Sequence, residues 1–165
     1  GGKYMSDSLG YRDMYRVVIS MDKGGVYDLY TDFGLVPSSK PYIEPRKHRE
    51  KYVEVPGRHG SIDLCELFSD TPLYDDITGS LEFIIQNKRF YNLLPNPSTN
   101  PNSLNDFGTF KRKIETALNG GTGSITILHD GTSETFKGRF WVDGYGNEDS
   151  HSTVTIGYRV APNIN

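Results

Sequence analysis

Hydrophobic and polar residues alternate over several short stretches of the chain, a pattern typical of β-strands with one buried face. The stretches predict strands over residues 14–21, 26–30, 81–86, 124–129, 134–143 and 150–160. The last strand would bury one face, whose residues are Val154, Ile156, Tyr158 and Val160. Most of the chain therefore reads as antiparallel β-structure.

Glycine-containing turns separate these strands. Gly24-Gly25 lies between the first two, and Asp130-Gly131 joins two of the later ones. Asp-Gly between alternating runs predicts a tight hairpin, because that turn needs residues that tolerate positive φ. A second turn is expected over residues 144–149.

One helix is predicted, over residues 104–119, because apolar residues recur there at helical spacing. They are Phe107, Phe110, Ile114 and Leu118. Ser103 or Asn102 would cap its start, and Gly120-Gly121 would end it as a glycine cap. The fold class predicted is mainly β: a β-sandwich of antiparallel strands with one packed α-helix.

The composition describes one domain of ordinary character. The 165 residues carry a formal net charge of -3, which gives no support for a nucleic-acid-binding surface. Residues 1–13 read as a flexible arm or an expression remnant, and residues 14–165 as the domain. A single cysteine, Cys65, excludes an intramolecular disulfide. No apolar run is long enough for a membrane span.

Two neighbouring loops carry the chain's most distinctive residues. Residues 38–51 contain a dense run of mixed charge, and residues 55–64 read Val-Pro-Gly-Arg-His-Gly-Ser-Ile-Asp-Leu. Proline and glycine shape the second loop, and by themselves they mark a tight connection between strands. The charge run is typical of a solvated loop, or of a contact between subunits in an assembly.

Side chains with catalytic potential are scattered. The four histidines, His48, His59, His129 and His151, lack the spacing of a zinc site. Ser61 has no nucleophile elbow, the adjacent Asp75-Asp76 reads as a solvated turn, and Cys65 lies among leucines like a buried apolar residue. We therefore predict no enzyme, no catalytic residue, no cofactor and no metal.

The order of these elements resembles the N-terminal domain of siphophage distal tail proteins. The resemblance is carried by the 55–64 loop, the strand over 81–86, the helix that ends in a glycine turn, and the closing strand with His151-Ser152-Thr153-Val154-Thr155-Ile156. It covers residues 14–162. His59 stands where that family more often has an acidic residue.

The resemblance implies a tail-tube-like structural protein of a phage or prophage virion. It would form a homo-oligomeric ring, expected to be a hexamer, at the tail tip, after synthesis in the bacterial host cytoplasm. The ring would link the tail tube to baseplate, hub or adhesion proteins, and DNA would pass through its channel without specific binding. Candidate interface residues are Arg46, Lys47, Arg49, Arg58, His59 and Asp63.

A host-surface or carbohydrate-binding module is the alternative. Trp141 and exposed tyrosines are the residue types that stack on sugar rings. Trp141 lies between Phe140 and Val142 in an alternating strand, however, and this context favours packing in the core. Glycan binding that is lost in a folded Trp141→Ala variant would favour the alternative.

Overall fold

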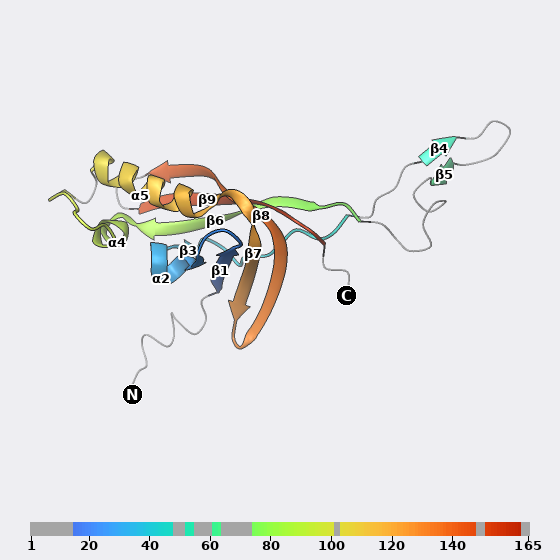
Figure 1. Cartoon of the computed structure of the whole chain (residues 1–165), viewed down its shortest axis with the longest axis horizontal. Helices are drawn as coiled ribbons and strands as arrows, with labels where there is room; N and C mark the ends of the chain where they lie inside the picture. Colours follow the sequence, from blue (N-terminus) through green and yellow to red (C-terminus); the bar gives the residue numbers. More distant parts are fainter. Residues whose placement is uncertain are drawn as a thin grey trace.

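The computed structural model describes residues 15–47, 52–54, 61–63, 74–100, 103–147 and 151–162 (Figure 1). Seven strands form one antiparallel sheet in the order β2-β1-β7-β8-β9-β6-β3, and β4 pairs with β5 in a separate ribbon. The strands are β1 Arg16–Met21, β2 Val26–Asp28, β3 Val36–Pro37, β4 Tyr52–Glu54, β5 Ser61–Asp63, β6 Ile77–Gln86, β7 Asn119–His129, β8 Thr132–Asn147 and β9 His151–Val160. The predicted mainly β fold of antiparallel strands with a packed helix is confirmed.

The sheet is curled because its two edge strands, β2 and β3, are neighbours in the sequence. Seven flat strands about 4.8 Å apart would span about 29 Å from edge to edge. The seven-residue link, residues 29–35, contains helix α2 (Leu29–Phe33) and reaches at most about 18 Å. The sheet must therefore bend into a sandwich-like shape. Accordingly, Lys40, beyond β3, lies 6.0 Å from the ring centre of Tyr15, before β1.

The helices pack on the buried, inner face of the curled sheet. Phe33 of α2 meets Phe110 of helix α5 (Leu104–Ala117) edge to face, with ring centres 6.5 Å apart. Strand residues with almost no exposed surface complete this core: Ile19, Phe83, Ile85, Ile125, Phe140, Val154, Ile156, Tyr158 and Val160. The predicted buried face of the last strand is thus confirmed.

Helix α2 corrects the prediction that a strand continues through residues 26–30. The strand ends at Asp28, whose carboxylate accepts hydrogen bonds from the Tyr30 and Thr31 amides. At the other end Gly34 adopts φ 69° and donates its N–H to the Tyr30 carbonyl. These two caps make a one-turn helix of residues whose types favour a strand.

Helix α5 (Leu104–Ala117) follows the predicted helix closely, and Ser103 caps its start by accepting from the Asn105 amide. Its predicted apolar face is buried. The predicted glycine cap is wrong: Leu118 is the C-cap, and its N–H bonds the Ile114 carbonyl. Gly120, at φ 85°, instead lies in the irregular first residues of β7, where the register with β8 shifts.

A third helix, α4 (Asn87–Asn92), follows β6 and was not predicted. Its six residues are too few to display a helical period. As for α2, so short a helix depends for its stability on tertiary contacts rather than on a helical sequence pattern.

Strands β7 and β8 form the predicted hairpin, and both turn residues have positive φ: 50° at Asp130 and 78° at Gly131. The second predicted turn begins too early, because β8 continues to Asn147 past a register shift between Val142 and Gly144. Because of this shift, one long strand pairs with β7 in the hairpin and continues its pairing with β9 as far as Asn147.

Trp141 also differs from its predicted place in the core. Phe140 is fully buried, and Trp141, the next residue along β8, is partly exposed on the opposite face of the sheet. Its indole covers Gly157, where an added Cβ would lie 2.5 Å from the Trp141 Nε1. The alternation of β8 was predicted, but its inward face was assigned to the wrong residue.

Candidate assembly surface

The chain leaves the sheet after β3 and returns before β6, and these two passages lie side by side. We call residues 38–47 together with Tyr74–Asp76 the arm base. The Asp75 amide donates to the Lys47 carbonyl at 3.0 Å. Beside it the Arg46 guanidinium lies 4.6 Å from the ring centre of Tyr74. The outgoing and returning passages are therefore bound to each other at the point where they leave the body.

The arm base is also fixed to the sheet. Ser38 donates its N–H to the Glu82 carbonyl, and the Glu44 N–H donates to the Tyr158 hydroxyl, each at 3.0 Å. Tyr158 is buried, and this burial raises the pKa of its hydroxyl. The hydroxyl fits over Gly79, where a Cβ would lie 2.4 Å away. Tyr158, a buried core residue, thus fixes the arm base to the sheet.

Strands β4 and β5 form the ribbon that this base supports. Three residue pairs are in antiparallel register, and Asp63 is opposite Tyr52. Figure 1 shows the ribbon well away from the seven-stranded sheet, beyond the start of β6. Residues 55–60 come between two paired strands, as predicted, but the predicted 55–64 loop extends too far, because Ser61–Asp63 form β5.

The structure separates the predicted interface residues into two groups. Arg46 and Lys47 lie together in the arm base. Asp63 lies in the outlying ribbon. The remaining candidates, Arg49, Arg58 and His59, fall outside the described residues.

Of the other candidate chemical groups, His129 and Asp76 have structural contacts, whereas His48, His59 and Cys65 fall outside the described residues. The His129 ring stacks on Tyr15, with centres 3.9 Å apart. Asp76 accepts from Arg159 at 3.2 Å, on the exposed side of the arm base. Within the part of the chain that the structure describes, no group of three His, Cys, Asp or Glu side chains could hold a metal ion.

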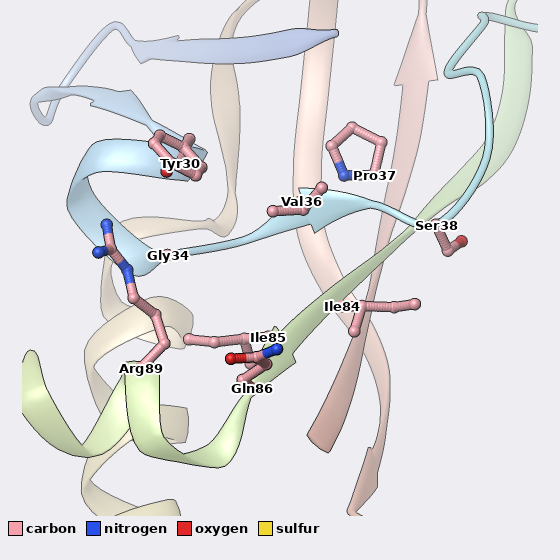
Figure 2. Close-up of a pocket in the computed structure, with 9 residues that line it drawn as sticks. All are labelled: Tyr30, Gly34, Val36, Pro37, Ser38, Ile84, Ile85, Gln86 and Arg89. Carbon is pink, nitrogen blue, oxygen red and sulfur yellow. The ribbon is translucent and has the colours of Figure 1, made fainter. Parts of the chain in front are cut away.

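A second surface feature lies where β3, β6, α2 and α4 meet. It is a groove of about 370 Å³, and its lining is mostly apolar: Tyr30, Gly34, Val36, Pro37, Ser38, Ile84, Ile85, Gln86 and Arg89 (Figure 2). Sequence patterns did not indicate it, because these residues come from four elements and two of the helices were not predicted. The caps of α2, Asp28 and Gly34, were the available signal.

Comparison of the chain with protein-family models, with curated proteins and with solved structures finds no match. The distal-tail resemblance therefore remains a prediction from the sequence. Among the described helices, none is long and apolar enough to cross a membrane.

Proposed function

We propose that this protein is a structural component of a phage or prophage tail tip. Copies form a ring that links the tail tube to the baseplate or adhesion device and leaves a channel for DNA. The observation that carries the proposal is the anchored arm: a base hydrogen-bonded to the curled sheet, and a two-stranded ribbon that lies away from the sheet (Figure 1). Such an extension suits contact with a neighbouring copy.

The edges of the sheet support assembly through loops and projections. The edge strand β3 has two residues, one of them Pro37, and the other edge strand, β2, has three. Short edges and proline limit uncontrolled strand pairing. Directed contact is then left to the arm and loops, where Arg46 and Lys47 carry charge that can set register.

The charge of the subunit is compatible with a DNA channel. A formal net charge of -3 avoids the general attraction to phosphate that basic surfaces supply. DNA would pass such a ring without being retained by it.

Electron microscopy of the concentrated protein, with and without tail-tube protein encoded by the same genome, tests the proposal. Rings, or protein capping the ends of tubes, are expected. A tube protein from an unrelated phage is the control for non-specific binding. A protein that stays monomeric and also fails to join the tubes would refute the proposal, whereas isolated monomers would not, because a ring can need the tube as template.

Trp141 supports a second candidate function, a carbohydrate-binding module. Its indole is partly exposed on the outer face of the sheet, a position from which aromatic rings stack on sugars. Glycan binding that disappears in a folded Trp141→Ala variant would support this function. Equal binding by wild type and variant, or none by either, would exclude this role for Trp141.

A further inference from the structure

The groove beside β3 contains an arginine that lies against Tyr30 and Gly34. The Arg89 guanidinium lies 5.3 Å from the ring centre of Tyr30. Its aliphatic stem passes Gly34 so closely that a Cβ there would lie 2.6 Å from the Arg89 Cγ. Figure 2 shows Arg89 rising from α4 beside Gly34 toward Tyr30. Glycine at position 34 thus allows both the α2 cap and the placement of this side chain.

Arg89 retains its capacity to bind a carboxylate. No acidic side chain among the described residues pairs with it, and its guanidinium lies over the ring of Tyr30. It is also the single charged residue of the groove, whose walls include Val36, Pro37 and Ile84. A guanidinium at the side of an apolar groove matches a ligand that presents a carboxylate next to an apolar side chain.

The chain itself carries such a combination. Four large hydrophobic residues are exposed in the described structure, and an acidic residue follows each by two positions. The pairs are Val26/Asp28, Tyr42/Glu44, Leu104/Asp106 and Leu128/Asp130.

In two of these pairs the acidic side chain already has a partner. Asp28 is bonded to Arg16, and Asp106 is buried against Ser98. In the third pair the Glu44 backbone N–H donates to the Tyr158 hydroxyl, so the backbone of this pair is bound to the sheet of its own copy. The fourth pair, Leu128 and Asp130, lies at the tip of the β7–β8 hairpin, which Figure 1 shows extending away from the helices.

The hairpin tip, residues 128–132, which we call the knob, is held by a contact within its turn and by a contact with Tyr15. Its turn is closed by the Thr132 hydroxyl, which donates to the His129 carbonyl at 2.6 Å, and His129 stacks on Tyr15. Asp130 is exposed and has no partner among the described residues. A preorganised projection loses little conformational entropy on binding.

We propose that the hairpin tip of one copy docks in the groove of the next copy, with Asp130 paired to Arg89 and Leu128 against the apolar walls. Knob and groove are different surfaces, so the contact is head-to-tail, the type that closes into a ring when the rotation allows. The inference rests on the proposed function, because it names the contact between copies in the ring.

Cysteine cross-linking tests the contact directly. In a Cys65→Ser background, Gln86→Cys places a thiol at the groove and Ser133→Cys places one beside the tip; both positions are exposed. Under mild oxidation, a mixture of the two single variants should give covalent heterodimers, and the double variant a ladder of larger species. The control pair Gln86→Cys and Lys23→Cys should give neither. Cross-linking no greater than in this control would overturn the inference.

Charge exchange tests the ionic pair. Arg89→Glu and Asp130→Arg should each reduce the cross-linked yield roughly tenfold or more, and combining them should restore it. Arg89→Met, which keeps an apolar stem, should behave like Arg89→Glu and shows that loss of the charge matters. Circular dichroism verifies that each variant is folded. Failure of the exchange to restore the yield would refute the pairing.

The two proposals can fail separately. Rings in the microscope without specific cross-linking would leave the tail-tip function standing and remove the knob-and-groove contact. Specific cross-links in a protein that forms no ring and joins no tube would keep the contact and remove the tail-tip function.

Discussion

The interior of the curled sheet and the segments that project from it are held by different interactions. The interior is a continuous apolar core in which Phe110, Ile114 and Phe140 have almost no exposed surface. The arm base and the hairpin tip are held by a few polar and aromatic contacts, such as the Asp75 amide with the Lys47 carbonyl. Changes in the interior should alter folding, and changes on the projections should alter assembly.

The largest effect is expected from Phe110→Ala in the interior. Truncating this buried ring should lower the free energy of unfolding by about 3–5 kcal/mol, because apolar contacts are lost and a cavity remains. Urea denaturation measures it. The control Leu104→Ala, on the same helix but 77% exposed, should change stability by no more than about 0.5 kcal/mol. Similar losses in both variants would contradict the position assigned to α5.

A smaller effect is expected at Gly34, which caps the end of α2 beside the groove. Gly34→Ala should cost about 2–3 kcal/mol, because it strains a backbone at φ 69° and displaces the Arg89 stem. Gly131→Ala is a matched control: its φ is 78° but nothing lies near an added Cβ, so backbone strain of about 1 kcal/mol should remain. Equal costs in thermal unfolding would show that Arg89 does not pack on Gly34.

Helix α5 is joined to β8 by Tyr145, whose hydroxyl donates to the Glu115 carboxylate. Burial, together with this bond to Glu115, raises the pKa of Tyr145 above its usual value. Tyr145→Phe should cost about 1 kcal/mol at neutral pH.

The raised pKa also sets the pH range of this effect. The unfolded chain releases the tyrosine proton near pH 10, below the folded pKa, so this stabilisation is present below about pH 10 and declines above it. Wild type should therefore lose stability more steeply than Tyr145→Phe as pH rises past 10. Parallel curves of unfolding free energy against pH would contradict the contact.

The smallest effect on stability is expected in the arm base. Arg46→Glu removes an exposed contact with Tyr74, worth about 0.5–1 kcal/mol. It also reverses a charge on the arm base, which we propose contacts a neighbouring copy. Ring formation should fall while the melting temperature stays nearly constant. Lys23→Glu, the same charge change on the β1–β2 turn, should leave assembly intact. A large fall in melting temperature would place Arg46 in the fold rather than in the interface.

Local patterns predicted α5 and most of the strands, because each depends on residues near in sequence. They did not predict β3, they placed β5 in a loop, and they began β6 and β7 later than Ile77 and Asn119, where these strands start. Alternation gave the β9 face, and Asp130-Gly131 gave the hairpin turn. Helix α2 was missed because Leu29–Phe33 is too short for a period and its tyrosine and phenylalanine favour strands. Trp141 was assigned to the wrong face because Phe140 and Trp141 are both aromatic, and the alternation alone does not show which of them points into the core.

The candidate site was predictable only in part. The charged run pointed to Arg46 and Lys47, but their position in an arm base depends on Tyr74 and Asp75, nearly thirty residues later. The groove depends on β3 pairing with β6 and on α2 joining opposite edges of the sheet. Such long-range pairings have no local signature, so Arg89 attracted no attention in the sequence.

Immunogold labelling of virions from the phage or induced prophage that encodes this chain tests the central claim most directly. Antibodies against the purified protein should place gold at the tip of the tail, and virions of an unrelated phage should remain unlabelled. Gold on the capsid, gold along the whole tail, or unlabelled virions in a lysate that contains the protein would contradict a tail-tip ring.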